Sequence, residues 1–86
     1  MQYFLAVAKR ITDVVLPGLP DEVEASVLKK IQALGSSDPK ADGSEPIEGV
    51  ANGYRVRCHD KSIEILYIVD DNYRHVWVFG VYIVVQ

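Results

Sequence analysis

Three apolar segments separated by short polar stretches fill the last third of the chain. In residues 54–59 apolar side chains alternate with polar ones, a period of two that predicts a half-buried β-strand. Residues 63–69 are almost continuously apolar, which is typical of a central strand, and residues 75–85 form a longer apolar segment. The stretches 59–61 and 70–72 between them predict turns. We therefore expect a three-stranded antiparallel meander.

The middle of the chain carries the clearest helical pattern. In residues 20–34 the apolar side chains form one stripe at helical spacing, namely Val23, Val27, Leu28, Ile31 and Leu34. Acidic residues lie near the start of this segment, where the helix dipole favours negative charge, and Gly35 is placed to end it in a C-terminal cap. Residues 10–16 predict a second, shorter helix that ends at Pro17 and Gly18.

The remaining segments complete the expected domain. Residues 3–8 are apolar and predict a short strand, whereas residues 35–49 are rich in Gly, Ser, Pro and Asp and predict a long loop. Residues 1–86 are enough for one domain and too few for two. The predicted fold is α+β: an N-terminal strand, two helices and the three-stranded antiparallel meander, with the helices packed on one face of the sheet.

Composition and charge narrow the classes of function. Hydrophobic residues make up 49% of the chain and charged residues 24%, which is typical of a globular domain. The net charge is −3, and this acidic balance disfavours nucleic acid or the ribosome as a partner, since nucleic-acid binders usually carry basic excess. The N-terminal apolar run is too short for a signal peptide or a membrane span, and the single cysteine fits a reducing compartment. We expect a cytoplasmic protein with no membrane contact.

The order of the predicted elements and three short strings resemble the RelE/ParE superfamily of toxin–antitoxin toxins. The strings are residues 53–57 (Gly-Tyr-Arg-Val-Arg), residues 45–49 (Glu-Pro-Ile-Glu-Gly) on the approach to the second strand, and residues 65–71 with their acidic turn. In topology the resemblance covers nearly the whole chain. It implies a toxin scaffold that binds a cellular target and that a partner segment neutralises.

The resemblance also implies two activities. The RelE branch is similar to ribosome-dependent mRNA endoribonucleases, which use basic residues to orient and stabilise the scissile phosphate, with general acid–base help. Arg55 and Arg57 match the two basic residues on the second strand of that branch. The ParE branch resembles a gyrase poison and does not need this catalytic set.

Several positions depart from the nuclease pattern. Glu64 stands where the RelE branch carries an arginine, and Glu45 and Glu48 stand where lysines are common. The later basic and tyrosine positions of that branch fall on Val84 or past Gln86. These departures favour a member that acts by binding, so we lean against an enzyme.

Five residues are candidates for binding a phosphate or an acidic partner: Arg55, Arg57, Lys61, Arg74 and His75. Two of them, Arg55 and Arg57, lie two apart on a predicted strand, so both point to one face, and they are also the weak candidates for catalysis. The alternative is a solvated face on which these arginines pair with Glu64 or Asp60.

Other chemically active side chains are placed less favourably. His59 and His75 fall at opposite ends of the intervening strand, and each is more often a surface residue than a catalyst. Cys58 faces the apolar side of its strand and is interpreted as a small buried hydrophobic residue. The sequence contains no metal-ligand pattern, phosphate-binding glycine loop or Ser-His-Asp pattern, so no cofactor and no metal are expected.

The last strand offers a second kind of surface. Alternation along residues 75–85, with a bend expected at Gly80, places four side chains on one face: Trp77, Phe79, Val81 and Ile83. The opposite face would carry Val76, Val78, Tyr82 and Val84. A strand that is apolar on both faces is either central in the sheet or covered by another chain. A central strand is the commoner case; in the other case, the first four residues form the predicted partner surface, for an antitoxin helix or for a second copy in a homodimer.

Three functions remain open at this point. The first is a RelE/ParE-like toxin, or a toxin-derived protein, that acts by binding a cellular target and is neutralised by a partner. The second is a small non-toxic interaction or inhibitor protein with the same fold, which the acidic charge also fits. The third is an intact ribosome-dependent mRNA endoribonuclease.

Overall fold

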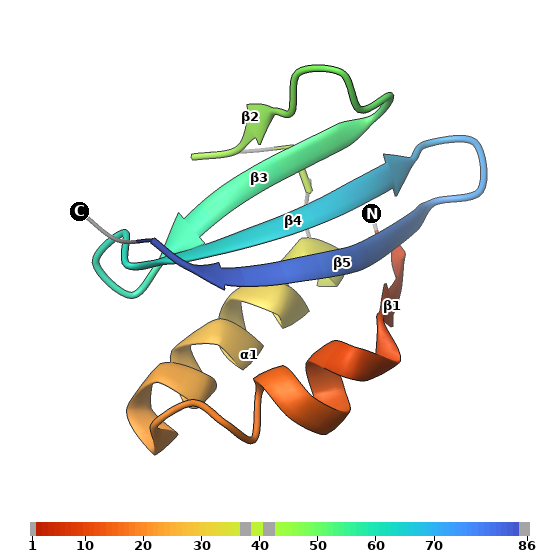
Figure 1. Ribbon diagram of the computed structural model, residues 1–86. Coiled ribbons are helices and arrows are strands. Elements are labelled where there is room, and N and C mark those ends of the chain that lie inside the picture. The colour runs from red at the N-terminus through yellow and green to blue at the C-terminus, as the bar shows by residue number, and fades with distance from the viewer. Residues whose placement is uncertain (1, 37–38, 41–42, 85–86) are drawn as a thin grey trace.

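The computed structural model describes residues 2–36, 39–40 and 43–84. All five strands form a single sheet, and the helical segments cover only one of its faces (Figure 1). The α+β class and the placement of the helical layer agree with the sequence prediction. The strands are β1 (Phe4–Val7), β2 (Glu45–Pro46), β3 (Gly53–Cys58), β4 (Ile63–Asp70) and β5 (His75–Ile83).

The sheet has the order β1-β5-β4-β3-β2 and is mixed. The pairs β2–β3, β3–β4 and β4–β5 are antiparallel, whereas β1 runs parallel to β5. The predicted sheet, an N-terminal strand and the three strands of the meander, therefore differs from the structure in two ways: β1 is parallel to its neighbour β5, and a further strand, β2, lies inside the predicted loop 35–49. No turn connects β1 to β5, so local sequence patterns carry no information on their relative orientation.

The central strand β4 organises the core. Its side chains alternate strictly, with Ile63, Ile65, Tyr67 and Val69 buried against the helices and the intervening ones half-buried on the open face. The neighbouring strands add Val56, Val76 and Val78 to the same buried layer. The expected central position of residues 63–69 is thus confirmed. Residue 85, the end of the predicted last strand, lies outside the described residues.

One main helix, α1 (Asp21–Ser36), faces the sheet through Val27, Ile31 and Leu34. The predicted second, shorter helix over residues 10–16 is a five-residue π-helical stretch, η1 (Ile11–Val15), so the structure has one main helix where two were predicted. Five residues give too few turns for a continuous apolar stripe, and η1 buries only Ile11.

Gly35 lies inside α1 and does not cap it, which corrects a second expectation. A Cβ atom at this position would lie 3.3 Å from the Leu5 Cβ atom and 3.4 Å from the Tyr3 carbonyl oxygen. The Tyr3 backbone N–H also donates to the Gly35 carbonyl oxygen at 2.9 Å. The glycine thus allows the helix end and β1 to approach closely, and its backbone does not adopt the left-handed conformation of a cap.

A β-bulge divides β5. Leu66 pairs with Gly80 while Tyr67 pairs with Val78, so Phe79 is an extra residue on β5. The bulge reverses the alternation beyond this point. It turns Val81, which is only 8% exposed, into the core, so Val81 is withdrawn from the predicted partner surface. The bend expected at Gly80 falls at this bulge.

The chain after α1 is fastened to the sheet at two points. The buried Pro39 accepts a hydrogen bond at its carbonyl oxygen from the Tyr67 hydroxyl, at 2.5 Å. Next to it, Lys40 Nζ lies 2.7 Å from one Asp71 carboxylate oxygen, and the Tyr3 hydroxyl donates to the other at 2.8 Å. Asp71 thereby links the N-terminus, the segment after α1 and the β4–β5 turn.

Replacing Asp71 with asparagine is expected to reduce the acid sensitivity of folding. Hydrogen bonds from Lys40 and Tyr3 hold the pKa of Asp71 below its ordinary value of 3.8 in the folded protein. The stabilisation is therefore present above the unfolded value and is lost as the pH falls through the lower folded pKa. Urea unfolding at pH 7 and at stepwise lower pH should show a smaller loss of stability in Asp71→Asn. An identical acid dependence in both proteins would contradict the assignment.

Candidate functional site

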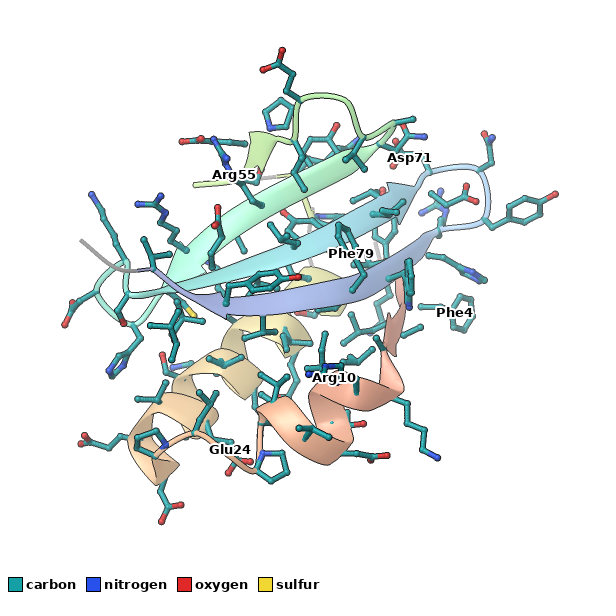
Figure 2. All side chains as sticks on the ribbon, in the orientation of Figure 1. Phe4, Arg10, Glu24, Arg55, Asp71 and Phe79 are labelled. Atoms are coloured by element: carbon teal, nitrogen blue, oxygen red, sulfur yellow. The ribbon has the colours of Figure 1, made fainter. Side chains whose placement is uncertain are left out.

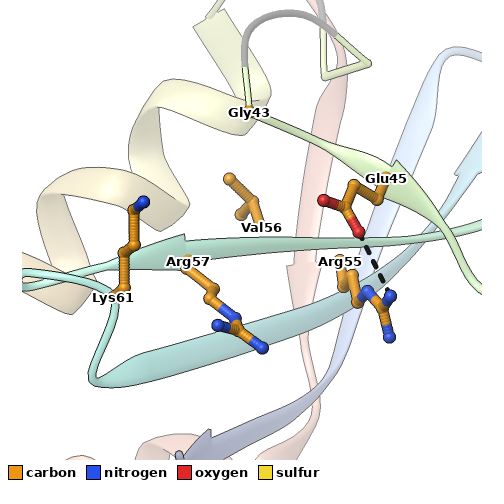
Figure 3. Close-up of a pocket in the computed structure, with 6 residues that line it drawn as sticks. All are labelled: Gly43, Glu45, Arg55, Val56, Arg57 and Lys61. Atoms are coloured by element: carbon orange, nitrogen blue, oxygen red, sulfur yellow. Dashed lines mark hydrogen bonds and ion pairs between the residues drawn. The ribbon is translucent and has the colours of Figure 1, made fainter.

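Three of the five predicted binding residues lie at one corner of the sheet. Arg55 and Arg57 belong to β3, and Lys61 lies in the following turn. They line a hollow of about 400 Å³ together with Gly43, Glu45 and Val56. The two guanidinium groups project from the same side of β3, as the strand period predicts, whereas the Lys61 side chain extends to the side of Val56 (Figure 3). The three cations share one hollow but do not converge on one point.

Arg55 is occupied by two carboxylates. Glu45, its direct partner in the β2–β3 ladder, lies 3.1 Å from Arg55 Nη2, and Glu64 on β4 lies 3.6 Å from Arg55 Nε. The pairing with Glu64 is the alternative that sequence analysis offered for this residue. Because Glu64 is only 19% exposed at its side chain, this contact is better shielded from solvent than an ordinary surface pair. The positive charge of Arg55 is thus compensated within the sheet.

Arg57 and Lys61, unlike Arg55, are not paired with carboxylates of the described residues. Both are exposed. Glu64 is the ladder partner of Arg57, but one of its carboxylate oxygens faces Arg55. The corner therefore presents two uncompensated cations to solvent beside one compensated cation.

The turn that carries Lys61 has an unusual backbone. His59, Asp60 and Lys61 have φ angles of 51°, 55° and 66°, all in the left-handed region. The Ser62 backbone N–H donates to the His59 carbonyl oxygen at 3.1 Å, which closes a type I′ turn around Asp60 and Lys61. Such turns favour glycine at the second central position, so a lysine there is held at a conformational cost.

Replacing Lys61 with glycine is expected to raise the free energy of unfolding by about 0.5–1 kcal/mol, because glycine adopts positive φ without a Cβ clash. The same change removes one uncompensated cation from the hollow. Asp60→Gly is the matched control, since it relaxes the same turn and leaves the hollow unchanged. Urea unfolding of both variants measures the change in the free energy of unfolding. A lower free energy of unfolding in both variants would contradict the conclusion that the turn is strained.

The other two predicted binding residues lie at the opposite end of the sheet, Arg74 as the last residue of the β4–β5 turn and His75 as the first residue of β5. The His75 ring packs edge-on against Phe4 at 5.5 Å between ring centroids. The Arg74 carbonyl oxygen accepts a hydrogen bond from the Phe4 backbone N–H at 2.7 Å. The predicted group of five therefore splits, and these two residues belong to the junction between β1 and β5.

An apolar surface extends over the face of the sheet opposite the helices. Trp77 and Phe79 lie side by side there with ring centroids 5.7 Å apart, and Phe79 is seen on the side away from the helical layer (Figure 2). Beyond the bulge, the Tyr82 ring lies over Gly80, where a Cβ atom would meet it at 2.6 Å. We define these three aromatic residues, Trp77, Phe79 and Tyr82, as the aromatic row.

The aromatic row differs from the predicted partner surface. Trp77 and Phe79 are retained, whereas Val81 is buried, and Ile83 lies on the helix side of the strand with 68% of its surface exposed. Tyr82 was assigned to the opposite face, and only a bulge signal could have corrected this assignment. Gly80 in the middle of an apolar strand was that signal, since such glycines often accompany bulges.

Cys58, the one cysteine of the chain, lies at the edge of the core. Cys58 is half-buried, packs against the core, and has its pKa raised by this burial, which disfavours the reactive thiolate. Among the described residues, no group of three or more His, Cys, Asp or Glu side chains is arranged to hold a metal ion. In the same part of the chain, no helix is both long and apolar enough to span a membrane.

The sequence matches no protein-family model and no curated protein, but solved structures resemble the fold closely. The isolated Escherichia coli RelE toxin superimposes with a TM-score of 0.78 at 20% identity, over 98% of this chain and 86% of that chain. The Mycobacterium tuberculosis RelBE2 toxin–antitoxin complex gives 0.78 at 20% identity, over 98% and 100%. The Pyrococcus horikoshii RelE–RelB complex gives 0.76 at 16% identity, over 96% of both chains.

Proposed function

We propose that this chain, which has the fold of the RelE toxins, is a toxin or a toxin-derived protein that acts by binding a cellular target and does not cleave RNA. The paired state of Arg55 carries this proposal. A scissile phosphate at Arg55 would have to displace both Glu45 and Glu64, and these carboxylates would repel it. Arg57 and Lys61 extend to different sides of β3, so they are poorly placed to hold one phosphate between them.

The open face of the sheet suits a protein target better. Trp77 and Tyr82 are 47% and 55% exposed, and aromatic side chains of this kind commonly supply the buried centre of protein interfaces. Arg57 lies beside this face at the β3–β4 corner, where it would contact an acidic residue at the rim of a partner. The proposed target is therefore a protein with an apolar patch bordered by acidic side chains.

A neutralising partner is the second part of the proposal. Three of the similar solved structures are complexes of a RelE-type toxin with an antitoxin, and a fourth contains an antitoxin peptide. A partner segment that covered the aromatic row would prevent the target from binding there, and it would bury the exposed apolar surface of the row. We expect the product of a neighbouring reading frame to fill this role in the cytoplasm.

Controlled expression tests the proposed function. Induction of the unmodified chain in a bacterial host should reduce colony counts while cellular mRNA stays intact, and co-expression of the neighbouring reading frame should restore growth. Growth arrest accompanied by mRNA cleavage at ribosomes would overturn the binding mechanism and favour the nuclease.

A non-toxic interaction or inhibitor protein is the second candidate. Two observations support it: the charge of Arg55 is compensated by carboxylates, and the chain has a net charge of −3. Together they leave little basic surface with which the protein could bind RNA. This candidate predicts normal growth after induction, together with recovery of a protein partner when the tagged chain is purified. Recovery of ribosomes or RNA would count against it.

A further inference from the structure

The C-terminal half of β5 has a free edge. β1 covers β5 only from His75 to Val78, and the chain then leaves the sheet to form η1. Figure 1 shows the rest of β5 continuing past β1 along the border of the sheet with no strand beside it. We call residues 79–83 the free edge. It contains no charged residue, although charged side chains are a common device that blocks unwanted pairing at such edges.

The direction of the backbone groups along the free edge follows from the ladder with β4. The Val84 N–H donates to the Ser62 carbonyl oxygen at 2.8 Å, so Val84 points its backbone toward β4. Alternate residues of an antiparallel pair point away from each other, and Ile83 and Val81 therefore direct their N–H and C=O groups outward. Within the described residues, no strand pairs with β5 at these two positions.

An apolar hollow lies directly beside the free edge, on the helix side of the sheet. It has a volume of about 340 Å³ and is lined by Val15, Gly18, Leu19, Ile63, Val81, Tyr82 and Ile83. Val81 forms part of its wall and is buried, whereas Ile83, two residues further along the same side, is 68% exposed. The edge thus combines an apolar cavity with an unburied apolar side chain of suitable size.

We propose that a second copy of this chain binds at the free edge, through antiparallel pairing of the two β5 strands about a two-fold axis at Tyr82. In this register Val81 of each copy lies opposite Ile83 of the other, and the outward backbone groups form two pairs of hydrogen bonds. Residues that face each other across a ladder project to the same side of the sheet. The exposed Ile83 of each copy therefore enters the hollow beside Val81 of the other.

This self-complementarity is why a second copy fits the edge. Val81, which forms a wall of the hollow, and Ile83, which would fill the hollow of the other copy, lie two residues apart on β5. A two-fold axis at Tyr82, midway between them, therefore places each Ile83 opposite the Val81 of the other copy. The two Tyr82 rings come together on the open face, and the two sheets become continuous with both helical layers on one side. The inference does not depend on the proposed toxin activity.

Sedimentation velocity of the purified chain from about 1 to about 200 µM tests the dimer. The unmodified chain should shift from monomer to dimer, and Ile83→Lys should raise the dimer dissociation constant by about 100-fold or more, since two charges enter the interface. Phe4→Lys, at a 74% exposed apolar residue on the other end of the sheet, should leave dimerisation unchanged. A monomer at every concentration, or a dimer that survives Ile83→Lys, would overturn the proposal.

Amide hydrogen exchange of the unmodified chain gives a test that needs no variant. The Val81 and Ile83 amides should exchange more slowly as the protein concentration rises, whereas the Val84 amide, already bonded to Ser62, should change little. Exchange rates at Val81 and Ile83 that are independent of concentration, while the protein dimerises, would place the interface elsewhere and overturn the pairing.

Discussion

Replacing Tyr67 with alanine is expected to lower the free energy of unfolding by about 3–5 kcal/mol, which is enough to unfold a small domain. Tyr67 is the largest fully buried side chain and lies on the central strand. Its ring stacks on Tyr54 at 6.1 Å between centroids, and its hydroxyl donates to the buried Pro39 carbonyl oxygen. Alanine would remove the ring from the core and leave that carbonyl without this donor.

Tyr67→Phe separates these two contributions. It keeps the ring and removes only the hydroxyl, so a loss of about 1–2 kcal/mol is expected. Urea unfolding followed by far-UV circular dichroism measures both variants. If Tyr67→Phe were as damaging as Tyr67→Ala, the hydrogen bond to Pro39 would dominate, and the packing account of the core would be contradicted.

Replacing Trp77 with alanine is expected to weaken target binding by about 30-fold, the effect of removing an interface anchor worth about 2 kcal/mol. Trp77 is 47% exposed on the open face and has its ring beside Phe79, where a partner would bury it. The measurement compares colony counts and the quantity of co-purified partner at equal expression of the two proteins. Stability should fall much less than in Tyr67→Ala, because Trp77 is already half accessible to solvent in the folded chain.

Leu28→Ala is the matched control for Trp77. Leu28 lies on α1, outside the open face, and is 39% exposed, so its truncation removes apolar surface of similar accessibility away from the proposed interface. It should leave the quantity of co-purified partner unchanged. Equal loss of partner in both variants would move the binding surface to the helices and contradict the role of the aromatic row.

Local periodicity was sufficient to predict the elements with strong patterns. The stripe from Val23 to Leu34 predicted α1, and the near-continuous apolar run of residues 63–69 predicted the central strand. In both elements the buried side chains recur at the spacing of the helix or strand, so the pattern can be recognised within a short stretch of sequence. The parallel β1 was beyond this reasoning, because its pairing with β5 joins segments more than 65 residues apart without a turn.

The candidate site was predicted in part for the same reason. Strand alternation placed Arg55 and Arg57 on one side of β3, and one of the carboxylates expected beside them, Glu64, does pair with Arg55. The ion pair between Glu45 and Arg55 could not be predicted, because it depends on the pairing of β2 with β3. A strand of two residues in a Gly- and Pro-rich segment has no recognisable sequence pattern. The aromatic row depended on the bulge at Phe79, since one extra residue transfers every later side chain to the other face.

The binding mechanism is tested most directly by incubating the purified chain with ribosomes that are translating a defined mRNA, and by measuring the length of that mRNA. We predict full-length mRNA both with the unmodified chain and with Arg57→Ala, because Arg55 is held by Glu45 and Glu64. Cleavage by the unmodified chain that Arg57→Ala abolishes would contradict the account and establish a nuclease on this fold.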